Sequence, residues 1–238
     1  MRYEQENQNR YQYAVPGQHA GVAQDTREKF IARVYNHLFL AIAAFTALEI
    51  AIFKLGYAER IAQAVWSVGP WAVVLGFIGV SWGATWVAHR AESKAAQYAA
   101  LSAFVVMEAI FFIPVLMRAL AYAPGAIQSA GIVTLVGFGG LTGIVLWTRK
   151  DFSFLGAFIR WGIFAVLGLV IASLVFSFTL GTLFSVAMVA FAGAIILYQT
   201  SSVIRDYPED RYVAASLDLF ASVAMMFLYV LRLFSDRR

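Results

Sequence analysis

From Ile31 onward, the chain consists of seven apolar stretches separated by short charged links. A helix needs about 20 apolar residues to cross the roughly 30 Å of hydrocarbon in a bilayer, and each stretch is close to that length. The pattern predicts an all-α membrane protein, a seven-transmembrane-helix bundle that occupies residues 31–238. The expected spans are 34–53, 71–87, 96–117, 126–147, 154–176, 180–200 and 212–234.

The composition excludes several other classes of protein. Hydrophobic residues make up 61% of the chain and charged residues 13%, whereas a soluble protein has about 45–50% apolar and about 25% charged residues. The absence of cysteine excludes disulfides, thiolate metal sites and thiol nucleophiles. The net charge of +4 comes from basic residues placed singly at the span ends, which indicates contacts with lipid headgroups rather than nucleic-acid binding.

Residues 1–30 are polar and predict a flexible N-terminal tail, with Asp25 or Thr26 as the N-cap of an entry helix. Lysine and arginine predict the orientation, because cytoplasmic loops carry an excess of them. Nine lie near the links on the side of the tail and six near those on the other side, so we expect a cytoplasmic N-terminus. Seven spans then place the C-terminus outside, whereas one re-entrant segment would bring both ends inside.

Three carboxylates lie inside the expected spans: Glu49 in the first, Glu108 in the third and Asp218 in the seventh. A charge at mid-bilayer costs roughly 2.5–3.5 kcal/mol on insertion scales, so each needs a partner, water or a proton. Glu49 lies near a helix end and is an interfacial anchor, a partner of Lys54 or part of an ion path. Glu108 lies near the midplane and is either a protonated contact between helices or a step in an ion or proton path.

Asp218 begins a polar stripe on its helix. Ser222 follows four residues later on the same face, and Met225 continues the stripe. We expect this stripe to line a gate near the cytoplasmic side. His37 and His89 lie at span ends and are predicted to be interfacial rather than metal ligands. The chain lacks the HExxH, GxSxG and P-loop motifs, so neither an enzymatic activity nor a bound metal or cofactor is predicted.

Four short segments resemble the Bax inhibitor-one family, also called the transmembrane BAX inhibitor motif family. They are TRKDFSFL at 148–155, IILYQTS at 195–201, YVAASL at 212–217 and FLYVLR at 227–232. The resemblance extends over about residues 33–234. It implies a bundle with the last helix near its centre and a pH-sensitive leak of Ca²⁺. Because the chain is minimal, we expect a bacterial member of the family that lies in the inner membrane.

In that family, two aspartates on the sixth and seventh helices, linked to an arginine, act as a proton-sensitive latch near the cytoplasmic side. Two close carboxylates cannot both ionise cheaply, so protonation changes the helix contacts. Here Gln199 and Ser222 occupy the two aspartate positions, Asp218 is the acid nearby, and Arg90 is the candidate arginine. We therefore expect a weaker pH response than in relatives that keep the pair.

Two functions follow as hypotheses. In the first, a channel-like protein lets Ca²⁺ or protons leak past Asp218, Ser222 and Gln199 at an inner constriction, with Glu108 further along the path; Ca²⁺ is then the permeant ion rather than a cofactor. In the second, a non-conducting membrane protein uses its polar residues to pin helices together and modulates stress, cell-death or membrane-protease partners.

Overall fold

The computed structural model describes the backbone of residues 18–235 and the side chains of residues 26–235, and this part of the chain forms helices without strands. Seven of the helices are long and apolar enough to span a membrane, which confirms the predicted seven-helix bundle. The elements are α2 (Gln18–Lys54), α3 (Ala58–Ser67), α4 (Gly69–Arg90), α5 (Lys94–Tyr122), α6 (Ala126–Thr148), α7 (Leu155–Val175), α8 (Thr182–Arg205), the 3₁₀ helix η1 (Glu209–Arg211) and α9 (Tyr212–Ser235).

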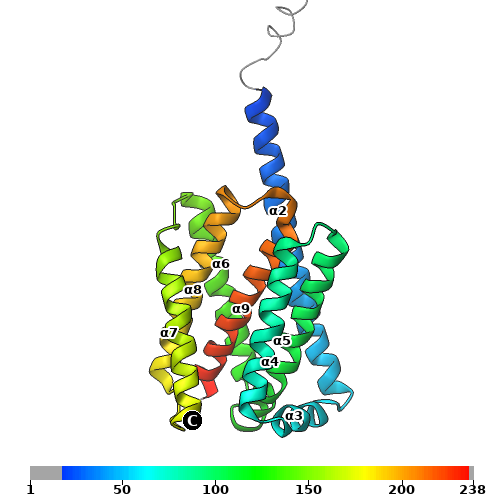
Figure 1. Cartoon of the computed structure of the whole chain (residues 1–238), viewed down its shortest axis with the longest axis vertical. Coiled ribbons are helices and arrows are strands. Elements are labelled where there is room, and N and C mark those ends of the chain that lie inside the picture. The colour runs from blue at the N-terminus through cyan, green and yellow to red at the C-terminus, as the bar shows by residue number, and fades with distance from the viewer. Residues whose placement is uncertain (1–17, 236–238) are drawn as a thin grey trace, which may run out of the picture.

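The last helix, α9, lies at the centre of the bundle (Figure 1). Of its membrane segment, 72% is buried inside the protein, against 11% for α4 and for α7. Small side chains at Ala214, Ala215 and Ser216 are fully buried, and such residues let neighbouring helices approach closely in a membrane. The central position that the family resemblance implies for the last helix is therefore confirmed.

The first described helix begins earlier than the sequence predicted. Helix α2 begins at Gln18, so Asp25 and Thr26 lie inside it and the prediction that one of them caps its start was wrong. Polar residues do not end a helix unless a breaker accompanies them, and this helix continues beyond the bundle as a projecting segment (Figure 1). Of the predicted tail, residues 1–17 lie outside the described part of the chain.

The link between the first two spans contains a helix that the sequence reading treated as a loop. Helix α3 lies across one end of the bundle (Figure 1). Its buried residues Ala58 and Ala62 share a cluster with Ile113 of α5, whereas Trp66 is 61% exposed. An amphipathic helix with an outward tryptophan is typical of a segment that rests in the membrane interface.

The described ends of α2 and α9 lie at opposite ends of the bundle (Figure 1). We call the end where α2 enters the N-side end; it carries the links 91–93, 149–154 and 206–211. The opposite end, called the far end, carries α3 and the last turn of α9. This arrangement agrees with an odd number of spans and leaves no re-entrant segment among residues 18–235.

Candidate functional site

The carboxylate of Asp218 meets two side chains at the N-side end. Its Oδ2 atom lies 3.1 Å from Nε2 of His89 and accepts a hydrogen bond of 3.0 Å from the hydroxyl of Tyr207. The Tyr207 hydroxyl is also 2.8 Å from His89 Nε2. We call His89, Tyr207 and Asp218 the latch triad. It joins the end of α4 and the turn after α8 to the central helix, and its side chains stay partly open, with 37% of His89 and 21% of Asp218 exposed.

The turn that carries Tyr207 is held from the opposite side by α2. The guanidinium of Arg27 donates 2.6 Å and 2.9 Å hydrogen bonds to the carbonyl oxygens of Tyr207 and Ile204, the kind of groups that a helix C-terminus leaves without partners. Burial raises the pKa of the Tyr207 phenol, and the Asp218 carboxylate raises it further. Tyr207 therefore keeps its hydrogen throughout the physiological range.

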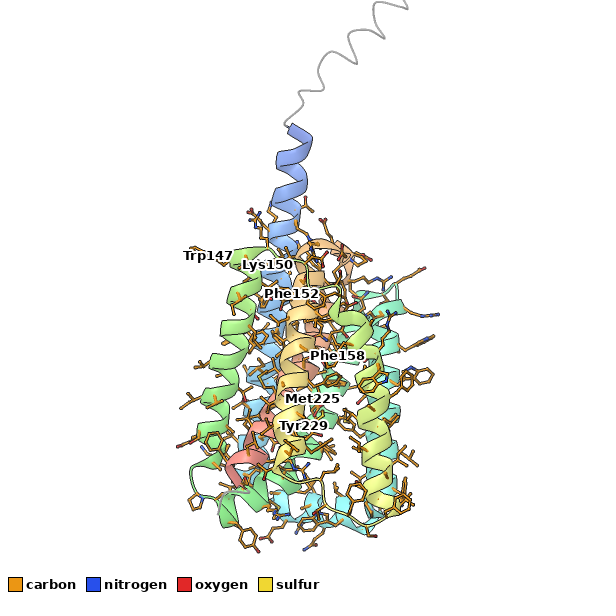
Figure 2. The ribbon with its side chains drawn as sticks, turned by 90° about the vertical axis from the view of Figure 1, so that its left-hand side faces the viewer. Trp147, Lys150, Phe152, Phe158, Met225 and Tyr229 are labelled. Carbon is orange, nitrogen blue, oxygen red and sulfur yellow. The ribbon has the colours of Figure 1, made fainter. Side chains whose placement is uncertain are left out.

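One turn deeper, the hydroxyl of Ser222 donates to Oε1 of Gln199 at 2.8 Å, so the residues at the two aspartate positions are in contact. The Ser222 oxygen also lies 3.0 Å from the carbonyl of Asp218. The stripe ends there, because Met225 packs with Tyr229 in the cluster between α7 and α8. Figure 2 shows these two residues further from the N-side end than Phe152.

Arg90 is not the partner of Asp218 in this structure. Its guanidinium lies over the ring of Trp86, 5.8 Å from the centroid. The preceding residue, His89, faces Asp218 instead. Successive residues of a helix point about 100° apart, so only one of the two can face α9.

The sequence reading missed both His89 and Tyr207 as partners of Asp218. The sequence placed His89 correctly at the end of its helix, but it did not show which other helix the His89 side chain contacts. Tyr207 lies in the turn that ends α8, just before Pro208. A tyrosine before a proline indicates a turn, and no signal in the sequence says which group its hydroxyl contacts.

The link between α6 and α7 is fastened to α8. Arg205 pairs with Asp151 and donates a 2.8 Å hydrogen bond to Ser201, while Asp151 accepts a 2.7 Å bond from the backbone of Ser153. Two of the four family-like segments therefore meet here, and the contact closes this side of the N-side end. The hydrogen bond from Arg205, followed by those from Ser153, lowers the pKa of Asp151 to about 2.

Asp151 is expected to contribute its full stabilisation to the fold above about pH 4. Its folded pKa of about 2 lies below the ordinary 3.8, so its stabilisation is complete above the ordinary value and is lost as the pH falls through about 2. The effect is small because the pair is exposed to water. Thermal unfolding of Asp151→Asn should begin at a slightly lower temperature than wild type at pH 6, with a smaller difference near pH 2. An equal difference at both pH values would contradict this, and Glu92→Gln is the exposed control.

Two further acids lie deep in the bundle. Glu108 of α5 is 4% exposed and Glu49 of α2 is 7% exposed. Neither carboxyl group has a hydrogen-bond partner among the described residues, and both oxygens of Glu49 are fully buried. No contact joins Glu49 to Lys54, so the pairing considered from the sequence is not formed here. Buried acids without partners are rare in membrane helices and mark candidate ion or proton pathways.

An aromatic layer separates these two acids. Phe45 of α2 lies 5.3 Å from Phe112 of α5, ring centre to ring centre, and Phe227 of α9 stacks on Phe112 at 5.6 Å. We call Phe45, Phe112 and Phe227 the aromatic layer. Glu108 precedes Phe112 by four residues and Glu49 follows Phe45 by four, so one lies about 6 Å on the N side of the layer and the other about 6 Å beyond it.

Hollows lie at both ends of the bundle. At the far end, a hollow of about 560 Å³ opens between α2, α3 and α5, lined by residues such as Phe53, Glu59 and Met117. At the N-side end, a small hollow of about 50 Å³ is lined by polar and charged residues, including Tyr198, Ser201 and Arg205. The aromatic layer lies between these two ends, which is the position of a hydrophobic constriction in a channel.

Comparison with known proteins identifies the family. A family model described as inhibitor of apoptosis-promoting Bax1 matches residues 27–238. An uncharacterized protein of Pseudomonas aeruginosa is 42% identical over 109 residues, which cover 45% of this chain and 49% of that protein. An uncharacterized protein of Campylobacter jejuni is 30% identical, covering 87% of this chain and 90% of its own.

A viral relative matches over a similar length. The Golgi anti-apoptotic protein of vaccinia virus is 28% identical over 212 residues, which cover 87% of this chain and 85% of the viral protein. The family model spans all seven candidate membrane helices, so the match concerns the whole bundle rather than one motif. The chain is therefore a member of the Bax inhibitor family, the family that its motifs resemble.

Proposed function

We propose that the protein is a slow cation leak channel, with Ca²⁺ as the principal ion, and that its gate lies around the central helix α9. The observation that carries this proposal is the latch triad, in which a carboxylate that is 21% exposed lies on the most buried of the seven candidate membrane helices. Acidic groups are what a cation path needs at its mouth, because they raise the local concentration of cations.

The deeper acids support a path that continues past the triad. Glu108 and then Glu49 follow at increasing distance from the N-side end, on helices that both pack against α9. Carboxylate oxygens are the ligands that Ca²⁺ prefers. The aromatic layer between the two acids closes the path in this structure, and hydrophobic constrictions of this kind gate channels by excluding water.

We place the N-side end in the cytoplasm and the protein in a bacterial inner membrane. The excess of lysine and arginine on that side supports the orientation, and two matched relatives are bacterial. The chain has no cysteine, so a single Ser93→Cys substitution can be labelled selectively. A membrane-impermeant maleimide should reach it from the cytoplasmic face, and labelling from the other face would contradict the orientation.

Asp218→Asn should lower the Ca²⁺ leak severalfold in proteoliposomes. The asparagine keeps the shape and can still bond to Tyr207 and His89, so the latch stays closed while the charge that attracts cations is lost. Efflux of entrapped Ca²⁺, followed with an external dye, measures the change. Asp206→Asn, an exposed acid at the same end, is the matched control and should leak like wild type. An unchanged rate in Asp218→Asn would contradict the assignment of the gate.

The second candidate function is a non-conducting interaction protein. The observation that favours it is the name of the vaccinia virus relative, an anti-apoptotic protein, together with the aromatic layer across the bundle. In that case, the triad and the Ser222–Gln199 contact would serve to fix the helices. Co-purification of a membrane-protein partner, combined with a leak no greater than that of protein-free vesicles, would favour this function over the channel.

A further inference from the structure

We infer that the hollow at the far end binds the headgroup of phosphatidylethanolamine, a membrane lipid that carries both an ammonium group and a phosphate. Glu59 inside the hollow binds the ammonium group, and basic residues on the surrounding helices bind the phosphate. The inference concerns a lipid ligand rather than ion flow, so it does not depend on the proposed leak function.

The hollow forms because the chain turns sharply after α2. Gly56 has a φ of 75°, a left-handed conformation that glycine adopts readily. Its backbone N–H donates to the carbonyl of Phe53 at 3.2 Å, and that of Tyr57 donates to the carbonyl of Ile52 at 3.0 Å, which caps the end of the helix. This turn directs α3 across the end of the bundle (Figure 1), and a hollow of about 560 Å³ remains between α2, α3 and α5.

The hollow lies at the level of the lipid headgroups. Helix α5 has 29 residues, or about 44 Å of helix, which matches the roughly 40–45 Å of a bilayer with its headgroups. Met117, Leu120 and Ala121 line the hollow from the last two turns of this helix. Trp66 and Tyr122 are exposed at the same end, and exposed aromatic residues of this kind mark the membrane interface. A lipid can therefore enter the hollow without leaving the bilayer.

The lining combines apolar walls with one acid. Phe53, Met117 and Leu120 supply apolar surface, and Glu59 is the one charged residue among the residues that line the hollow. Its carboxylate has no ion pair in the described part of the chain. Glu59 lies in the first turn of α3, where an acid is favourable, but that role does not need a hollow beside it. The volume falls within the roughly 300–1,000 Å³ of small-molecule sites, so the hollow suits a ligand with a cationic group and an apolar tail.

Each of the three helices around the hollow carries a basic residue directly after a lining residue. These are Lys54 of α2, Arg60 of α3 and Arg118 of α5. All three are exposed, and none forms an ion pair within residues 26–235. Lysine and arginine side chains are the usual partners of phosphate groups. The site therefore offers one negative charge inside the hollow and positive charges around it.

Charge complementarity distinguishes the common phospholipids at such a site. The ammonium group of phosphatidylethanolamine has three N–H donors for the Glu59 carboxylate, as a lysine ammonium has. Phosphatidylcholine has the same phosphate, but its quaternary ammonium has no N–H group to donate. Phosphatidylglycerol has a phosphate and no cation, so Glu59 repels it. The expected order of affinity is phosphatidylethanolamine, then phosphatidylcholine, then phosphatidylglycerol.

Native mass spectrometry of the full-length protein in detergent, with each lipid titrated in turn, measures this order. Wild type should bind phosphatidylethanolamine about tenfold more tightly than phosphatidylglycerol, the effect expected of one charge-assisted hydrogen bond. Glu59→Gln should remove most of this difference, because the amide is neutral. Glu92→Gln, an exposed acid at the N-side end, is the matched control and should keep the wild-type order.

Two further variants test the charge and the space separately. Glu59→Lys should reverse the order, so that phosphatidylglycerol binds more tightly than phosphatidylethanolamine. Ala121→Trp should weaken the binding of all three lipids by filling the hollow, whereas Ala99→Trp, at an exposed site near the other end of α5, should not. Added phosphatidylethanolamine should accordingly raise the unfolding temperature of Ala99→Trp more than that of Ala121→Trp.

Three results would overturn the inference. The first is equal affinity of the wild-type protein for the three lipids, as expected of lipids that surround the bundle without a site. The second is a wild-type preference for phosphatidylglycerol, because the basic residues alone would then bind an anionic lipid. The third is a preference for phosphatidylethanolamine that persists in both Glu59→Lys and Ala121→Trp, because the lipid would then bind elsewhere.

Discussion

Replacing Phe112 with alanine is expected to raise the Ca²⁺ leak about tenfold or more. Phe112 is 1% exposed and touches both other members of the aromatic layer, Phe45 and Phe227. Removing its ring lets water enter between Glu108 and Glu49, and a barrier lower by only about 1.4 kcal/mol speeds passage tenfold. The leak of proteoliposomes, measured at one protein density and one pH, gives the ratio.

The adjacent residue supplies a matched control for Phe112. The ring of Phe111 lies 4.6 Å from that of Phe77 on α4, on another side of α5. Phe111→Ala therefore removes the same number of atoms without opening the layer. Both variants should unfold at a lower temperature than wild type, because each leaves a cavity, but only Phe112→Ala should leak faster. Equal leak rates for the two variants would show that the aromatic layer is not the barrier.

Glu108→Gln should change stability and ion flow in opposite ways. The buried carboxyl of Glu108 has no partner among the described residues, and holding such a group in a membrane costs roughly 2.5–3.5 kcal/mol if it is charged. The amide has nearly the same shape and no charge, so the melting temperature of the purified protein should rise. The Ca²⁺ leak should fall severalfold, because the path loses its carboxylate near the midplane.

A substitution at a second buried polar residue distinguishes the effect on stability from the effect on the Ca²⁺ leak. Ser185 of α8 is fully buried, and its hydroxyl has no hydrogen-bond partner in the described part of the chain. Ser185→Ala should raise the melting temperature in the same direction as Glu108→Gln and leave the leak unchanged. If Glu108→Gln is more stable and leaks as fast as wild type, Glu108 is a structural contact between helices, the other interpretation drawn from the sequence.

The sequence predicted the spans well because bilayer thickness constrains them directly. The predicted span 126–147 corresponds to α6 (Ala126–Thr148), and 212–234 to α9 (Tyr212–Ser235). Hydrophobicity carries no such information about helices in water, so the projecting start of α2 and the interfacial helix α3 were missed. Both segments are polar or amphipathic, so a search for long apolar stretches does not find them.

The candidate site could be predicted only in part. The sequence identified Asp218, Gln199 and Ser222 as site residues, because the family motifs specify which positions of the sixth and seventh spans face each other. The contact between α4 and α9 could not be predicted, because nothing in a single sequence gives the rotation of one helix relative to another. A rotation of about 100° decides whether His89 or Arg90 faces Asp218, and with it whether an imidazole or a guanidinium meets that carboxylate.

The most direct test of the account is Ca²⁺ efflux from vesicles that contain the purified wild-type protein. The proposed function predicts a slow efflux that exceeds that of protein-free vesicles and increases with the amount of protein. Release of the remaining Ca²⁺ by an ionophore at the end of each run confirms that both sets of vesicles were loaded. Equal efflux with and without protein, across about pH 5 to 9, would contradict the central claim that this bundle conducts cations.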